Sequence, residues 1–537
     1  MEPSDPQPSH DEPLEPTEPV LPTLPTRISI LTGPPAASAS PPAPDQWLQD
    51  QPYGASAHAP YAVASSSRGE RWKKLFLPAL VVAIVAGGAA VIFRDKLFPK
   101  DSAPAYPSEW DVRVAPIADF VRAERGLQWV HPVYVDFLAE ADFVELFDLP
   151  TAPLSDDEEA AVRASSLLYD ALGLAVDYDP TQGDSTVSAV TALGFYSPAN
   201  DRVYIRGDQT TPAVRVVLAH ELTHALQAQH FEVDTGGSND LEVRAIIEAD
   251  ALRVENVYLE SLPEADQAAA NQANALAPEA EEELSDVPWA ILEQRYAPYV
   301  LGPMLVEQVF ATDGNEGVNE LIRTPPTEEI LLNPWLHGDP AQAPVEVLVE
   351  VPLGTTAIDE PQPMSQVNML IMLDAWLPWE QARQALDGWA GGGYTSYQRE
   401  NAVCFTATVT FENSGTRFAA AITAWAAASG SSAAPTTIVN DVTFEACNRG
   451  PGATEPDVPV VSPLEALLVE QDAIARDGQD PSSGQIERQQ CFAATMIDDP
   501  LLAPLLFKTT LTTDEEAVFL WQSTIAANDC GVAPPTP

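Results

Sequence analysis

Residues 210–231 read TTPAVRVVLAHELTHALQAQHF, and this stretch decides how the centre of the chain is interpreted. Thr211 is a preferred N-cap, and the proline after it suits the first position of a helix, so a helix is predicted to begin here. Residues four apart share one helix face, which brings His220 and His224 together and leaves Glu221 one step away. The stretch therefore predicts two imidazole nitrogens and a carboxylate within one short helical segment.

The spacing H-E-x-x-H is typical of zinc sites in metallopeptidases, where the glutamate serves as general base. We predict that Zn²⁺ is bound by His220 and His224, and that Glu221 takes a proton from a water at the ion. Two hydrogen-bonded core histidines beside a surface glutamate are the alternative. A structural zinc site would favour four ligands rich in cysteine, and no cysteine lies near this motif.

The third metal ligand is expected from a second helix, predicted over about residues 240–259. Glu248 shares a stripe there with Leu241 and Leu252, and an ionised carboxylate on an apolar stripe needs a cation or strong hydrogen bonds. Asp250 lies on the opposite stripe, about 200° away, and is predicted to orient a neighbouring group such as a ligand histidine. The reverse assignment of these two acids stays open.

His230 is a third histidine in the same stretch, at a spacing similar to that of the metzincin peptidases. Their motif requires glycine where Gln227 stands, and glutamine is a good helix former. If the helix continues, His230 lies about 9 Å further along the axis than His224, too far to share the ion. We expect it beside the site or at the surface.

The pair HELTH and IIEADA, with Glu248 lying 24 residues after His224, resembles the gluzincin class of zinc peptidases. More narrowly, residues 112–426 resemble a group of uncharacterised membrane-anchored bacterial metallopeptidases. The resemblance is carried, in order, by GFYSPANDRVYI, HELTHALQAQHF, EADA, PYVLGPMLVEQVF, RTPPTEEILLNP and GWAGGGYTSY. The group usually has glycine at the position of Ala249 and histidine at the position of Asn333.

The resemblance implies zinc-promoted hydrolysis of a peptide bond in a peptide or protein substrate, with Glu221 passing a proton to the leaving amine. Because asparagine replaces the usual histidine at position 333, one polar side chain that could assist catalysis is missing. Tyr299 of PYVLG and His230 are therefore the candidates for stabilising the transition state, with structural roles as the alternative. An extended substrate is expected to pair with the hairpin predicted over residues 194–207. The competing hypothesis is a catalytically inactive envelope scaffold or binding protein.

The run LFLPALVVAIVAGGAAVIF, residues 75–93, contains no charge and is long enough to cross a bilayer as a helix. A buried core helix is the alternative, but basic residues flank both ends. Four basic residues before the run and three after it favour a cytoplasmic N-terminus. We therefore predict a single-pass protein of the cell membrane whose C-terminal domains are extracytoplasmic.

The chain has 537 residues, enough for two to four folded units. Its 79 acidic residues against 26 basic ones give a formal net charge of -53. A surface so acidic repels phosphate, so nucleic acid is excluded as a partner.

All four cysteines follow the membrane segment, in two pairs of similar spacing, Cys404 with Cys447 and Cys491 with Cys530. Neither pair has the spacing of a metal site, so structural disulfides in an oxidising compartment are predicted. Three connectivities are possible, of which we favour the two local bridges. Reduced, buried cysteines are the alternative.

The predicted fold class is α+β, with a mainly helical zincin-like domain, an upstream β-hairpin and α+β disulfide-containing modules at the C-terminal end. Residues 288–334 are expected to be helical, with a turn at DGNEG. The expected divisions are a disordered Pro-rich acidic tail at 1–70, a transmembrane helix at 71–96, a metallopeptidase domain at 97–344, an α+β module at 345–450, a linker at 451–463 and a C-terminal module at 464–537. The similar openings CFTATVTFE and CFAATMIDD hint at an internal repeat.

Overall fold

The computed structural model describes most of the chain that follows the predicted membrane segment. The described residues are 106–147, 156–231, 241–273, 282–338, 345–358, 361–450, 452–476, 481–508 and 511–533. The tail predicted over residues 1–70 and the transmembrane helix predicted over residues 71–96 lie outside them. None of the helices within the described ranges has the length and apolarity that crossing a bilayer requires.

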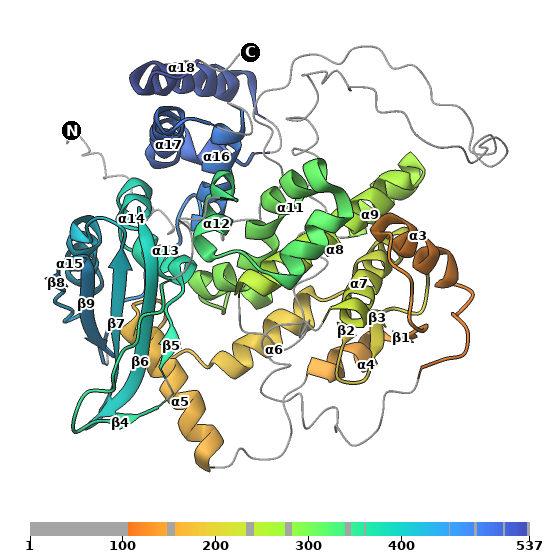
Figure 1. Ribbon diagram of the computed structural model, residues 1–537, viewed down its shortest axis with the longest axis horizontal. Coiled ribbons are helices and arrows are strands. Elements are labelled where there is room, and N and C mark those ends of the chain that lie inside the picture. The colour runs from red at the N-terminus through yellow and green to blue at the C-terminus, as the bar shows by residue number, and fades with distance from the viewer. Residues whose placement is uncertain are drawn as a thin grey trace, which may run out of the picture.

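The predicted α+β class with mainly helical structure is confirmed. The helices of the first part of the chain are α3 (Ala115–Arg125), α4 (Glu140–Val144), α5 (Asp156–Ala171), α6 (Pro180–Thr191), α7 (Pro212–His230), α8 (Leu241–Ser261), α9 (Glu264–Ala273), α11 (Trp289–Arg323) and α12 (Glu328–Leu332). Helices α7, α8, α9 and α11 lie side by side in the middle of the molecule (Figure 1).

A small sheet lies next to α7 and contains the predicted hairpin. Its strands are β1 (Tyr134–Leu138), β2 (Gly194–Ser197) and β3 (Arg202–Arg206), in the order β1-β3-β2. Strand β1 is parallel to β3, whereas β2 is antiparallel to it, with Tyr196 opposite Val203. The turn between β2 and β3 places Asp201 in the left-handed region at φ 56°. Strand β2 is thus an edge strand of this sheet, and α7 packs against both β2 and β3.

Helix α7 begins as its sequence predicts. The side chain of Thr211 accepts a hydrogen bond from the N–H of Val214, and Pro212 occupies the first turn. The helix continues through Gln227 to His230 without the sharp turn of a metzincin.

Helices α8 and α11 cross at very close range. A Cβ atom added at Gly302 of α11 would lie 1.9 Å from the carbonyl oxygen of Ala245 and 2.8 Å from the Cβ of Ala249, both on α8. Only glycine fits at this crossing, since any side chain would push the helices apart. The glycine of PYVLG therefore sets the distance between α11 and the segment of α8 that carries Glu248.

A larger antiparallel sheet follows α12 in the chain and forms one side of the molecule (Figure 1). Its strands are β4 (Thr356–Ala357), β5 (Gln362–Pro363), β6 (Trp389–Arg399), β7 (Ala402–Phe411), β8 (Thr436–Ile438) and β9 (Asp441–Cys447). The order is β4-β6-β7-β9-β8, and β5 also pairs with β6. The helices of this part are α13 (Gln366–Asp374), α14 (Trp379–Ala385) and α15 (Thr416–Ser429).

The three consecutive glycines of GWAGGGYTSY have a structural explanation in β6. Cβ atoms added at Gly391 and Gly393 would lie 2.0 and 2.1 Å from the carbonyl oxygens of Val345 and Val347. The segment that begins at residue 345 therefore crosses β6 with its backbone directly against the strand.

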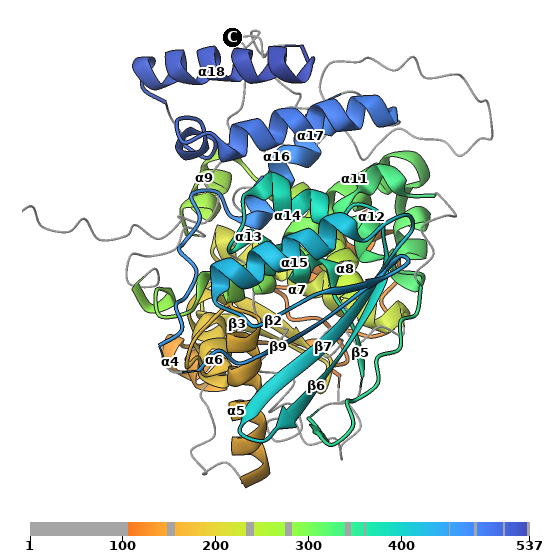
Figure 2. The same cartoon turned by 90° about the vertical axis from the view of Figure 1, so that its left-hand side faces the viewer.

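Beyond residue 462 the described elements are all helical. They are α16 (Pro463–Ala475), α17 (Ser483–Asp498), a 3₁₀ turn (Ala503–Leu505) and α18 (Thr513–Cys530). Helices α17 and α18 are stacked at one end of the molecule (Figure 2). The segment CFTATVTFE lies in strand β7 and CFAATMIDD begins within helix α17, so the suggested internal repeat is wrong.

Both predicted local disulfides are present. Cys404 on β7 is bonded to Cys447 directly opposite on β9, and Cys491 on α17 is bonded to Cys530 at the end of α18. The prediction of two local bridges is thereby confirmed, and the alternative of reduced cysteines is wrong.

Two apolar cores meet at the central helices. One contains residues of α3, the small sheet, α7 and the C-terminal part of α8. The other contains residues of α8 and α11 and extends through the larger sheet to Cys530. This second core includes residues on both sides of the domain boundaries predicted near 344 and 463. The division into separate domains at these positions therefore stays a prediction.

Candidate metal centre

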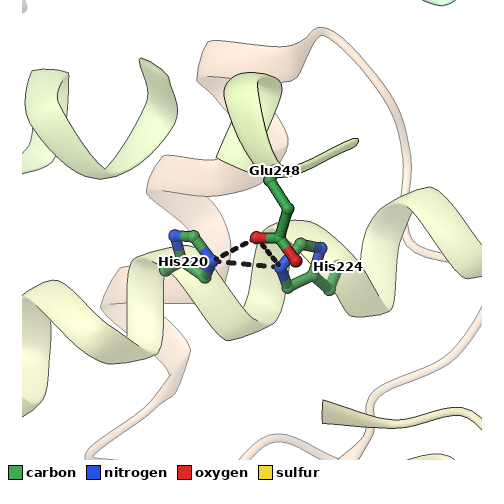
Figure 3. Close-up of side chains that lie close together, drawn as sticks. All are labelled: His220, His224 and Glu248. Carbon is green, nitrogen blue, oxygen red and sulfur yellow. Dashed lines mark hydrogen bonds and ion pairs between the residues drawn. The ribbon is translucent and has the colours of Figure 1, made fainter. Parts of the chain in front are cut away.

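His220, His224 and Glu248 converge between α7 and α8 (Figure 3). The Nε2 atoms of the two histidines lie 3.0 Å apart. The Oε2 atom of Glu248 lies 3.3 Å from each of them. All three side chains are buried, and within the described part of the chain no other group of three such residues could hold a metal ion.

Glu255 of α8, which belongs to neither sequence motif, contacts His220. Its Oε2 lies 2.9 Å from Nδ1 of His220, and both side chains are buried. A proton on Nδ1 satisfies this contact and leaves the Nε2 lone pair directed at His224 and Glu248. Glu255 follows Glu248 by two helical turns, so extending the stripe of α8 by seven residues would have identified it.

Nδ1 of His224 lies 3.0 Å from Oε1 of Gln227, on the same helix. Asp250, predicted to orient a neighbouring group, does not contact a histidine itself. Its Oδ2 instead accepts a hydrogen bond of 2.9 Å from Nε2 of Gln227. Glu248 and Asp250 thus face different partners on α7.

Tyr299 lies within the centre. Its hydroxyl donates a hydrogen bond of 3.2 Å to Oε1 of Glu248, while Oε2 of the same carboxylate faces the histidines. Burial raises the pKa of Tyr299 well above its usual range, which keeps the phenol a neutral donor. Tyr299 precedes Gly302 by about one turn of α11, so the close helix crossing brings the hydroxyl within reach of Glu248.

Glu221 is buried beside the three converging residues. Its Oε2 accepts a hydrogen bond of 2.8 Å from the backbone N–H of Tyr196 on β2. Burial raises the pKa of Glu221 above its ordinary value, although the charges of His220 and His224 oppose this shift. The carboxylate of Glu221 thus contacts strand β2 and lies close to the charges of the two histidines.

The electrostatics of the three converging residues are strongly coupled. Burial by itself lowers the pKa of His220, but hydrogen bonds to Glu248 and Glu255 outweigh it and raise that pKa well above the usual range. Burial by itself raises the pKa of Glu248, and His224 and His220 together bring it below its ordinary value. The buried carboxylates thus favour a positive charge at the point where the two histidines face Glu248.

His230 and Asn333 lie outside this group. His230 is exposed in the last turn of α7, and its Nε2 lies 2.6 Å from the carbonyl oxygen of Gln128. Asn333 ends α12, where its side chain donates to the carbonyl oxygen of Glu329 and accepts from Arg383. Neither contacts His220, His224 or Glu248.

The chain matches no family model, no curated protein and no solved structure.

Proposed function

We propose that this chain is a zinc-dependent peptidase of the gluzincin type. The observation that carries the proposal is the convergence of three acceptor atoms, Nε2 of His220, Nε2 of His224 and Oε2 of Glu248, beside the carboxylate of Glu221. With both Nδ1 atoms directed at acceptors, three lone pairs point at one another. A cation at the centre of such an arrangement would stabilise it, and a bound metal ion would supply that charge.

The donor set fits zinc. Two imidazole nitrogens and one glutamate oxygen are the protein ligands of many catalytic zinc sites, which keep a fourth position open. Ligand atoms around a tetrahedral ion with bonds of about 2.0–2.1 Å lie about 3.3 Å apart. The three separations of 3.0, 3.3 and 3.3 Å agree with this spacing. Zinc held there would lower the pKa of a water and polarise the carbonyl of the substrate.

The chain's own residues then carry the proton transfers. Glu221 takes a proton from the attacking water and delivers it to the leaving amine. Its raised pKa, which burial causes, brings the carboxylate closer to the range that suits an acid and base in turn. Tyr299 donates to Oε1 of Glu248 and so directs the other oxygen toward the histidines.

The substrate class is an extended peptide or protein segment. Strand β2 is the outer strand of its sheet, and the N–H of Tyr196 on that strand reaches Glu221. A peptide added as a further strand along β2 would lie with its backbone beside the general base. We further propose that residues 75–93 anchor the chain in the membrane, with the disulfide-bonded part outside the cytoplasm, where such bonds persist.

Casein digestion by the purified full-length chain tests the proposal. Glu221→Gln keeps the size of the side chain but removes its basicity, so the rate is expected to fall by about 100-fold or more. Glu264→Gln, an exposed acid on α9, is the matched control and is expected to digest casein at the wild-type rate. Equal rates for the Glu221→Gln variant and the wild type would contradict the proposal.

A further inference from the structure

Gln227 follows His224 by three residues on α7, and its side chain is 1% exposed. The amide nitrogen Nε2 donates to the carbonyl oxygen of Ile247 at 3.0 Å and to Oδ2 of Asp250 at 2.9 Å. A carbonyl and an ionised carboxylate only accept hydrogen bonds, so these two partners fix which end of the amide is the nitrogen. Oxygen Oε1 must therefore face His224.

This orientation determines the tautomer of His224. Oε1 of Gln227 only accepts, so the proton of the imidazole lies on Nδ1, and Nε2 keeps its lone pair toward His220 and Glu248. We propose that Gln227 is a positioning residue that holds His224 in its metal-binding tautomer, and that Asp250 acts on His224 through Gln227. This proposal rests on the proposed function, because it assigns the metal to Nε2 of His224.

Asp250 is itself held by two arginines. Nε of Arg125, the last residue of α3, lies 2.8 Å from Oδ2 of Asp250, and both side chains are fully buried. Arg253, one turn further along α8, lies 3.4 Å from Oδ1. Because each of these buried groups has a charged partner, the carboxylate keeps a fixed position under Gln227.

A kink in α11 completes this support. Gly314 has φ 63° and ψ -153° inside the helix, a conformation that side chains rarely adopt. After the kink, Asn315 and Asn319 each accept a hydrogen bond of 2.8 Å from the guanidinium of Arg125. Asn315 also accepts from Arg253 at 3.1 Å. Helices α3, α8 and α11 thus converge on Asp250.

Charge explains why an amide, and not a second carboxylate, contacts His224. The pocket already contains the carboxylates of Glu221, Glu248 and Glu255. A fourth acid in contact with the ligands would add repulsion in a buried site. Gln227 contacts both Asp250 and His224, so the fixed carboxylate of Asp250 also fixes the amide beside His224. The negative charge of Asp250 itself stays beside Arg125.

The experiment measures the zinc dissociation constant of the full-length chain by competition with a chromophoric chelator. Gln227→Met keeps the length of the side chain but removes its polar end, and it is expected to weaken zinc binding by about 10- to 100-fold. Asp250→Ala is expected to weaken binding less, by about 10-fold. In the double variant the dissociation constant is expected to equal that of Gln227→Met alone, since Asp250 acts only through Gln227.

The matched control is Asp170→Ala. Asp170 is also buried and paired with an arginine, Arg449, but it lies on α5 and contacts none of the metal residues. It is expected to lower stability without changing the dissociation constant. If Gln227→Met does not fold, Gln227→Asn, which is one methylene too short to reach His224, takes its place. The visible absorption of the Co²⁺-loaded chain is expected to change in either Gln227 variant and to stay unchanged in the control.

The proposal is overturned if Gln227→Met binds zinc within about twofold of the wild type, or if the losses in the double variant multiply. Both results presuppose a wild-type chain that binds zinc. A wild-type chain that binds none would instead contradict the proposed function, so the two failures are distinguishable.

Discussion

Oε2 of Glu255 lies 2.9 Å from Nδ1 of His220, and neither side chain is accessible to solvent. The first histidine of H-E-x-x-H is therefore oriented by a charged group on α8, whereas His224 is oriented by the neutral amide of Gln227. The two histidines that converge on one centre thus depend on different helices for their direction.

Replacing Glu255 with alanine is expected to weaken metal binding by about 10- to 100-fold, because His220 loses the partner that fixes its tautomer. Chelator competition on the purified chain checks this value. Glu260→Ala, an exposed acid on the same helix, is the control and is expected to bind metal like the wild type. Unchanged affinity in Glu255→Ala would show that His220 needs no such partner.

Gly302→Ala is expected to lower the free energy of unfolding by about 1–3 kcal/mol. The added methyl group would lie 1.9 Å from the carbonyl oxygen of Ala245, so α11 must move away from α8 and take Tyr299 with it. Denaturant unfolding measures the loss, and metal affinity should fall in the same variant. At Gly484 an added Cβ would lie 3.5 Å from the end of the flexible Arg488 side chain, an ordinary contact, so Gly484→Ala is the control. Equal losses in the two variants would contradict the close crossing.

The stability of the chain is expected to depend on pH through Glu293. Its Oε2 accepts a hydrogen bond of 3.1 Å from the N–H of Leu464 at the start of α16. Burial, and then the charge of Glu465, raises its pKa from 4.5 to about 8. Between these values the folded chain holds a proton that the unfolded chain has lost. The stability from this group is complete below pH 4.5 and is lost as pH rises through about 8.

The free energy of unfolding of the wild type should therefore decrease from about pH 5 to about pH 8. Glu293→Gln cannot ionise and is expected to remove about 1 kcal/mol or more of that decrease. Urea unfolding at several pH values gives the comparison. The exposed Glu487→Gln serves as control and should keep the wild-type slope. An unchanged slope in Glu293→Gln would rule out this carboxyl as the source.

The disulfide Cys404–Cys447 joins strands β7 and β9 directly across the larger sheet and encloses a loop with a sequence separation of 43 residues. Replacing both cysteines with serine is expected to lower the free energy of unfolding by about 2–4 kcal/mol, because the unfolded chain is no longer constrained. Thermal and denaturant unfolding measure this change. A variant as stable as the wild type would show that the hydrogen bonds between β7 and β9 stabilise this pairing without the disulfide.

Much of the central fold follows from local pattern. The cap at Thr211, the hairpin around residues 198–201 and the second helix at Leu241–Ser261 could all be predicted from short-range signals. The stripe on that helix predicted the position of Glu248 opposite the histidines, because helical periodicity fixes which residues share a face. That these residues bind zinc stays a prediction.

Other features depend on contacts between distant segments. The sequence indicates only that Gln227 is a helix former, since no local pattern shows that Ile247 and Asp250 accept hydrogen bonds from its amide. The turn expected at DGNEG is a kink inside α11 at Gly314, because Asn315 and Asn319 beyond it pair with Arg125. The suggested repeat failed for a similar reason, since tertiary packing decides whether a short apolar run becomes a strand or a helix.

Zinc content by elemental analysis of the full-length chain tests the central claim most directly. We expect about one zinc per chain in the wild type and in His230→Ala, whose imidazole lies by the carbonyl oxygen of Gln128, away from the three converging residues. We expect none in His224→Ala or Glu248→Ala, each of which removes one of the three converging ligand atoms. A wild-type chain that stays free of zinc after reloading, or a Glu248→Ala variant that retains it, would contradict the account.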